Sequence, residues 1–405
     1  MLFLSLLFFV SEQSKKLTGC PNNIIHEIMK KSGTSSLPLH GGKAPPWLVG
    51  RMKKLSKPII RIIVDDYGRD EFLRRLSDPY WFQSLGCVLG YDWHSSGLTT
   101  VTTGVLKESL SSMDVGIFAG GGKGKTSLKT PEEIETFSRK FSFSDDKTES
   151  LKYASRMSAK VDNTAIQAGA PLYHHAFFAS EDGEWTVIQQ GMDTENQVAR
   201  RFHWISEGVD NFVEEPHEAI LAQKRKDRVL NMTAKTSEEC RKTSTDLIKD
   251  NPKEIKRDFY SLIPEKQKSL KEWMPESKRA NRKVKILNLP KRLNWNALEK
   301  AHELQPENFE KLLNIRGIGP ATTRGLALVS EIIHGDSASW DDPAKYSYAF
   351  GGKDGVPYPV NRVAMDKAHR TLKSAIEEAE LGREEKLNAI KRLESFSSGK
   401  SKDER

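Results

Sequence analysis

A short segment with two glycines, Ile315-Arg316-Gly317-Ile318-Gly319, constrains this 405-residue chain more than any other. Pro306 can begin a helix before it, because the first turn of a helix has N–H groups without intrahelical partners. Pro320 can begin a second helix after it, and Gly335 can end that helix. The apolar residues on both sides recur at helical spacing. The sequence therefore predicts two short helices joined by a tight turn over residues 306–335.

The glycines of this turn predict an anion site. Two glycines before a helix leave backbone N–H groups that no Cβ covers, and a helix N-terminus attracts phosphate. From Leu312 to Leu328 the segment resembles the helix-hairpin-helix motif of DNA repair proteins, which implies contact with the backbone of duplex DNA without reading of bases. The alternative is an ordinary helix pair whose glycines serve only the turn. The residues expected to bind nucleic acid are Arg316, Gly317, Gly319, Thr322, Arg324 and Lys353.

The charge distribution favours a polyanionic partner. The chain has a net charge of +8 and a pI near 9.1. Residues 223–292 contain 21 Lys and Arg against 10 Asp and Glu, a net +11, so the rest of the chain is slightly acidic. A positive field just before the turn is suited to a phosphate backbone, although a solvated linker helix would have the same composition.

The cysteine content and the N-terminal segment indicate the cellular compartment in which the protein is expected. Three cysteines, Cys20, Cys87 and Cys240, are too few for a disulfide framework, so a reducing cytoplasm is expected. The apolar segment at residues 1–10 is too short to span a bilayer and lacks the charged start of a secretory signal. We interpret it as an over-extended start, with Met29 as the alternative initiator. A weak hydrophobic anchor is the competing interpretation, and no membrane association is expected.

Composition and periodicity divide the chain into an α+β N-terminal domain with a small sheet and a C-terminal all-helical domain that contains the helix-hairpin-helix. The expected parts are a non-native or disordered extension (1–32), the α+β domain (33–222), a basic helical connector (223–285), the helical domain (286–397) and a disordered tail (398–405).

Three Gly-Gly-Lys sequences end at Lys43, Lys123 and Lys353. The second follows a predicted strand at residues 115–119 and continues to Thr126, which meets the loose form of a phosphate-loop signature. A helix start is better placed at Thr130, however, so a flexible basic loop that contacts phosphate is the preferred interpretation. The candidates for phosphate contact are Lys43, Lys123 and Lys125.

Two strands are predicted on either side of Asp182-Gly183, a dipeptide that suits a hairpin turn. The first contains His174 and His175, which must point to opposite faces of a sheet and cannot both reach one ion. No metal site is predicted.

The DNA repair proteins with this motif include DNA glycosylases, and the catalytic residues that this resemblance implies are incomplete here. Glycosylases with this hairpin carry an aspartate in a P-V-D-x-x-V context, and Tyr358 to Val363 looks similar. Asn361 replaces the aspartate and cannot be ionised to act as a base. Ala321 stands where related lyases carry a Schiff-base lysine, so a lyase step is not expected. The remaining candidates for catalysis are Asp92, His94, Asp354 and Asp366.

Several long segments, among them SLPLHGGKAPPWL, GIFAGGGKGKTSLKTPEEI and GGKDGVPYPVNR, resemble a family from archaea and bacteria that is defined only as a domain of unknown function. The resemblance covers nearly the whole chain and implies a prokaryotic cytoplasmic protein. It brings no catalytic residues.

Three hypotheses follow. The first is a DNA repair enzyme, glycosylase-like or nuclease-like, and the second is a DNA-binding or scaffolding module without catalysis. The third is a nucleotide-dependent enzyme that uses residues 120–126. Double-stranded DNA is the expected partner in the first two. The cofactor is unknown, with a divalent cation expected only for a nuclease, and the sequence does not indicate an oligomeric state.

Overall fold

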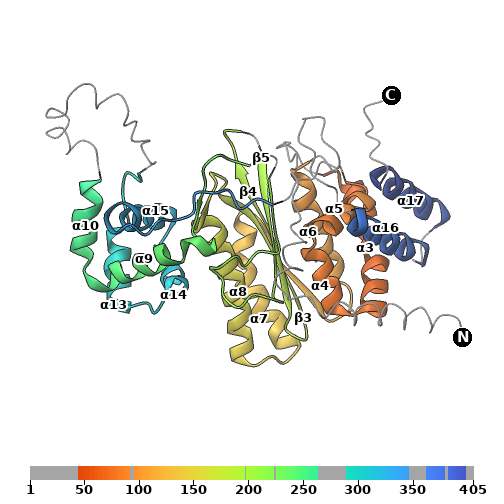
Figure 1. Ribbon diagram of the computed structural model, residues 1–405. Coiled ribbons are helices and arrows are strands. Elements are labelled where there is room, and N and C mark those ends of the chain that lie inside the picture. The colour runs from red at the N-terminus through yellow and green to blue at the C-terminus, as the bar shows by residue number, and fades with distance from the viewer. Residues whose placement is uncertain are drawn as a thin grey trace, which may run out of the picture.

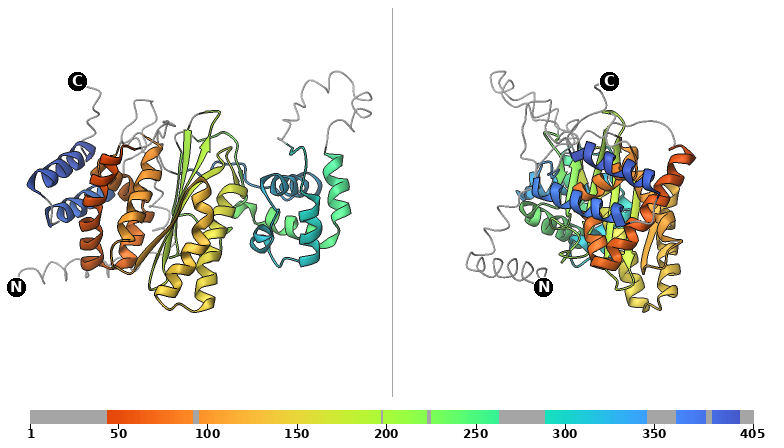
Figure 2. Two further views of the ribbon diagram at one scale, coloured as in Figure 1. Left: turned by 180° about the vertical axis from the view of Figure 1, so that it is seen from behind. Right: turned by 90° about the vertical axis from the view of Figure 1, so that its right-hand side faces the viewer.

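The computed structural model describes residues 44–91, 95–196, 198–222, 225–262, 289–345, 362–378 and 382–397. These residues form an elongated molecule with a sheet at its centre, helices on both faces of the sheet, and a bundle of short helices at one end (Figure 1). Figure 2 shows the same parts from behind and along the long axis. The fold is mixed α and β.

The central sheet is antiparallel, with its strands in the order β1-β3-β4-β5-β6. The strands are β1 (Ile117–Lys123), β3 (Leu172–Ser180), β4 (Trp185–Asp193), β5 (Val198–Ile205) and β6 (Ala219–Ala222). The predicted hairpin is confirmed, because β3 pairs with β4 across a turn in which Gly183 adopts a φ of 97°. Both faces of the sheet are buried under helices.

Strand β1 differs from the prediction of a strand at 115–119 followed by a flexible loop. It continues through three glycines to Lys123 and pairs with β3 along its whole length. At Gly121, φ is 84° and a Cβ would lie 2.2 Å from the carbonyl oxygen of His175. The glycine at this position therefore lets two strands approach closely.

One face of the sheet carries α3 (Pro46–Tyr67), α4 (Arg69–Ser77), α5 (Pro79–Val88) and α6 (Gly97–Leu110). Two late helices, α16 (Arg362–Glu378) and α17 (Arg383–Ser397), pack against α5, and α16 also contacts α3 (Figure 1). The other face carries α7 (Thr130–Lys140) and α8 (Asp145–Thr164).

The bundle at the far end contains α9 (Glu238–Asp250), α10 (Pro252–Ser261), α13 (Trp295–Leu304), α14 (Phe309–Asn314) and α15 (Pro320–Val329), which runs into a π turn at Ser330–His334. A separate two-stranded sheet pairs β2 (Ile166–Gln167) with β7 (Leu230–Asn231). In the chain, β2 directly follows α8, and β7 precedes α9, the first helix of the bundle. One hydrophobic core runs from the α7–α8 side of the sheet into the bundle. The bundle is therefore packed onto the sheet domain.

The parts of the molecule do not follow the expected order along the chain. The described part of the expected connector supplies α9 and α10, which pack against α13 and α15. Helices α16 and α17, which we grouped with the hairpin, lie at the opposite end of the molecule (Figure 1). Helical periodicity predicted these elements but carried no information about which partners they would meet.

Within the described residues, no helix is both long enough and apolar enough to cross a membrane. The apolar segment at residues 1–10 lies outside the described part of the chain.

Candidate functional site

The turn between α14 and α15, residues 315–319 (the α14–α15 turn), is fixed from inside by one apolar side chain. Ile318 is completely buried in the core that the bundle shares with α8. Its amide donates to the carbonyl of Ile315 at 3.3 Å, and the Ile315 amide donates to the carbonyl of Leu312 at 3.1 Å. The glycines on either side of the buried isoleucine are left exposed or half-buried.

Gly317 is required by the fold. Its φ of 98° lies in the left-handed region, and a Cβ there would lie 2.8 Å from the Cβ of Ala297. The side-chain amide of Asn294 also donates to the Gly317 carbonyl at 3.3 Å. This glycine therefore allows α13 to pack against the turn, and its presence needs no ligand.

Gly319 is not required by the fold. Its φ of −121° and ψ of −174° are extended values that any residue can adopt, and no atom lies within 4 Å of a Cβ built there. It is the N-cap of α15, a position where serine, asparagine or aspartate would stabilise the helix more. A glycine in open space directly before a helix leaves room for a group that approaches the backbone.

Several backbone amides at this helix start have no acceptor. Thr323 donates to the Gly319 carbonyl at 3.0 Å, and Pro320 has no N–H. Among the described residues, no acceptor is found for the amides of Gly317, Gly319, Ala321 and Thr322. Unpaired amides at the positive end of a helix form a general anion-binding arrangement.

Lysine and arginine side chains from α8 reach one side of the turn. The Lys160 ammonium lies 3.5 Å from the carbonyl oxygen of Ile315, and the Arg156 guanidinium donates to the Asn314 side chain at 2.9 Å. Lys160 has no described carboxylate in ion-pair contact, and its burial lowers its pKa. A half-buried cation without a counter-charge is suited to receive an anion.

A second cationic group lies beside the start of α15. Gln167 donates to the carbonyl of Pro320 at 2.8 Å and accepts from Arg324 at 2.8 Å. The guanidinium of Arg324 lies 5.5 Å from the ring centre of Trp340, and that of Arg228 lies 4.4 Å from it. Burial and the nearby Arg228 lower the pKa of Arg324. Neither arginine forms an ion pair with a described carboxylate, so positive charge accumulates here.

The structure distinguishes among the residues predicted to bind nucleic acid. Arg316 is exposed beside the unpaired amides. The side chain of Thr322 is buried and its hydroxyl accepts from the Asn294 amide at 3.3 Å, so only its backbone N–H can serve a ligand. Lys353 lies outside the described residues. Sequence reasoning missed Lys160, Gln167 and Arg228, although Arg156 and Lys160 form a basic pair four residues apart on one helix face.

Of the four predicted catalytic residues, the structure describes only Asp366, which does not lie at this turn. Asp92, His94 and Asp354 lie outside the described residues. Asp366 belongs to α16, at the opposite end of the molecule from α14 and α15 (Figure 1). Their assignment stays a prediction.

The arrangement of a phosphate loop is not formed at residues 120–126. The glycines belong to β1, the Gly-Lys-Thr sequence forms a 3-10 turn over Gly124–Lys129, and α7 begins only at Thr130. In a phosphate loop the helix begins at the Gly-Lys-Thr sequence, so that its amides surround the phosphate. Lys123 and Lys125 are exposed, and Lys43 lies outside the described residues.

The two adjacent histidines point to opposite faces of the sheet, as expected. The Nε2 of His174 is 2.9 Å from the Thr103 hydroxyl on α6, whereas His175 contacts Ser155 on α8 (2.9 Å) and Gln189 (2.8 Å). The described residues contain no group of three or more side chains arranged to hold a metal ion.

A buried carboxylate joins α8 to the sheet. Asp162 accepts from Gln189 at 2.6 Å, from the Trp204 indole at 3.0 Å and from His217 at 2.5 Å. Burial raises the pKa of Asp162, while His217 and the other donors oppose that change. Because its side chain is completely buried, this group holds the core together and offers no surface to a ligand.

The fold and the site define a class: a mixed α and β protein with a packed helical bundle that presents a cation-flanked, amide-lined turn. Residues 33–360 match the family model described as "Protein of unknown function (DUF763)". Because this match covers most of the chain, the protein belongs to that family. Comparison with curated proteins and with solved structures finds no match.

Proposed function

We propose that this protein binds double-stranded DNA by its sugar-phosphate backbone, through a helix-hairpin-helix made of α14, the α14–α15 turn and α15. The observation that carries the proposal is Gly319, which has open space around it and extended backbone angles. The fold would accept another residue there, whereas a phosphate that approaches the amides of α15 would not. Close approach of a backbone to a ligand is a common reason for such a glycine.

Charge supports the same partner. Arg316 belongs to the turn, Lys160 contacts its Ile315 carbonyl, and Arg324 lies on α15 with Arg228 on the same tryptophan ring. None of the four forms an ion pair with a described carboxylate. Phosphate oxygens are the strong acceptors that guanidinium, ammonium and helix N-terminal amides share. The proposed contacts of the turn amides and of Arg316 are with phosphate oxygens, so we propose that they position DNA without reading its sequence.

The repair-enzyme and binding-module hypotheses share this surface and differ in chemistry. The repair hypothesis is supported by the resemblance of the turn to repair proteins, and its proposed catalytic residues are Asp92, His94, Asp354 and Asp366. Incubation with duplexes that contain uracil, hypoxanthine, an abasic site or a flap, with and without Mg²⁺ or Mn²⁺, separates the two. Base release or strand cleavage that is lost in the Asp92→Asn or Asp354→Asn variant supports an enzyme; intact DNA in every mixture supports the module.

A salt titration tests DNA binding itself. If four cations each neutralise one phosphate, the slope of log affinity against log salt is about −3.6. Raising the salt concentration fourfold should then weaken binding by roughly a hundredfold. A fluorescein-labelled duplex followed by anisotropy measures this directly, and an affinity independent of salt refutes the proposal.

A further inference from the structure

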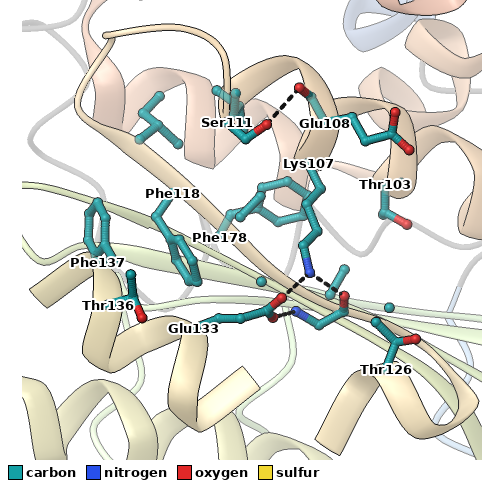
Figure 3. Close-up of a pocket in the computed structure, with 18 of the residues that line it drawn as sticks. Thr103, Lys107, Glu108, Ser111, Phe118, Thr126, Glu133, Thr136, Phe137 and Phe178 are labelled. Carbon is teal, nitrogen blue, oxygen red and sulfur yellow. Dashed lines mark hydrogen bonds and ion pairs between the residues drawn. The ribbon is translucent and has the colours of Figure 1, made fainter. Parts of the chain in front are cut away.

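A second concave site lies on the sheet domain, away from the α14–α15 turn. It is a cavity of about 640 Å³ between α6, β1 and α7 (the α6–α7 cavity; Figure 3). Ligand sites for small molecules commonly have volumes of this order. None of its lining residues belongs to the bundle.

An ion pair crosses the cavity and completes the outer edge of β1. The Gly121 amide donates to the Glu133 carboxylate at 2.7 Å, and the Lys107 ammonium donates to the Gly121 carbonyl at 2.8 Å and to Glu133 at 2.5 Å (Figure 3). These side chains take the place of a neighbouring strand for one residue of β1. Their role in the fold is thereby explained.

His174, in the wall of the cavity, is not explained by the fold. We assign the Nε2–H tautomer to His174, because the Thr103 hydroxyl donates to the Thr99 carbonyl at 2.8 Å and is left to accept from the ring. The Nδ1 of His174 is then an acceptor, and no described residue donates to it. The side chain is almost completely buried, and burial, with contributions from His175 and Lys123, lowers its pKa to about 3. It stays neutral, and its unpartnered Nδ1 is buried in the wall and not exposed to the cavity.

Gly104 also lacks a structural reason. It lies inside α6, where glycine is less stable than alanine by roughly 0.5–1 kcal/mol. A Cβ built there would meet no atom within 4 Å, and the residue lines the cavity. The absence of a side chain at Gly104 therefore leaves space in the cavity beside α6, at some cost in helix stability.

The two ends of the cavity differ in chemistry. Phe118, Phe137, Phe141 and Phe178 make one part apolar, and Phe118 stacks on Phe137 with ring centres 4.9 Å apart. At the other part Lys123 ends β1, exposed and without an ion pair to a described carboxylate. A ligand that satisfies both parts has an apolar body and a negative group.

We propose that the α6–α7 cavity binds a small amphipathic organic anion. Its apolar body packs against the phenylalanines, and its negative group meets Lys123. The proposal does not depend on DNA binding at the α14–α15 turn.

Two fluorescent probes test the proposal in the full chain. Anilinonaphthalene sulfonate is an aromatic anion whose emission rises in apolar sites, and phenylnaphthylamine is its uncharged counterpart. We expect saturable binding of the sulfonate at one site per chain. The Lys123→Gln variant should weaken it roughly tenfold and leave the uncharged probe unchanged, because a charged hydrogen bond is lost. Lys129→Gln, at the end of the 3-10 turn that follows Lys123 and outside the cavity lining, is the matched control.

A second pair of variants tests the location. Gly104→Leu should fill the cavity and lower the affinity for both probes more than tenfold, with an unchanged or higher melting temperature. Gly104→Ala should bind both probes with unchanged affinity. Thr136→Phe fills the cavity from α7 and serves if Gly104→Leu does not fold. Undiminished binding in the folded filling variant, or equal loss of both probes in Lys123→Gln, would overturn the proposal.

Discussion

Replacing Gly319 with aspartate separates the stability of the fold from the proposed binding of DNA. The backbone angles at Gly319 suit any residue, and its surroundings are open. An N-cap aspartate can accept from the amides at the start of α15 and interacts favourably with the helix dipole. Together these effects should stabilise the protein by a few tenths to about 1 kcal/mol.

The same substitution should remove DNA binding. The aspartate occupies the amides that would meet the phosphate, and two charge-assisted hydrogen bonds are each worth at least about 1.5 kcal/mol. Their loss alone corresponds to roughly a hundredfold in affinity. Repulsion adds to this, since two unit charges about 4 Å apart near a protein surface interact by about 4 kcal/mol before salt screening.

Gly382→Asp is the matched control. Gly382 also directly precedes a helix, has no atom within 4 Å of a built Cβ, and accepts from Lys386 at 3.1 Å much as Gly319 accepts from Thr323. It lies before α17 at the opposite end of the molecule and changes the net charge equally (Figure 1). Anisotropy with a labelled duplex and thermal melting should show loss of binding without loss of stability only for Gly319→Asp. Wild-type affinity in folded Gly319→Asp, or equal loss in both variants, refutes the reasoning.

Three further predictions concern neighbouring residues and pH. Gly317→Ala should destabilise the protein by about 2–4 kcal/mol, from left-handed strain and overlap with Ala297, which urea unfolding measures; an unchanged midpoint contradicts the assigned packing role. Lys160→Gln should weaken duplex binding about tenfold and reduce the salt slope by about 1 without lowering stability, because a desolvated cation without a counter-ion is removed. An unchanged slope places Lys160 outside the interface. Stability should fall as pH drops from about 6.5 towards 3, because unfolded His174 binds a proton that the folded residue, with a pKa of about 3, does not. The contribution is about 1.4 kcal/mol per pH unit for this residue, and His175 and His203 add with the same sign. Unfolding free energies that are equal at pH 7 and pH 5 contradict the buried neutral histidine.

The sequence predicted those elements of the fold that are determined by a few neighbouring residues. Asp182-Gly183 indicated the β3–β4 hairpin, and alternation along a strand placed His174 and His175 on opposite faces. The helix start at Thr130 was preferred over a start at the Gly-Lys-Thr sequence, and α7 begins there. Each of these depends on neighbours within a few residues.

What could not be predicted depends on distant partners. The two glycines of the α14–α15 turn look equivalent in the sequence, yet only Gly317 faces another helix, because only the fold brings Ala297 against it. Lys160 precedes the turn by more than 150 residues, and nothing in its own neighbourhood indicates that it reaches Ile315. The glycines of β1 indicated a loop in the sequence, because the reason for Gly121, the close approach of β3, is visible only in the fold.

The position of Lys160 has a consequence for how the two parts of the molecule act together. Four side chains attach the turn and α14 to α8 and β2: Tyr153 to Glu310, Arg156 to Asn314, Lys160 to Ile315, and Gln167 to Pro320. The shared hydrophobic core lies beneath them, so the turn is held rigidly against the sheet domain. A phosphate bound by the amides of α15 would therefore contact cations from both parts at once and would not require them to move. Binding to such a preorganised surface loses little conformational entropy, so few contacts would suffice to hold the DNA backbone that we propose as its ligand.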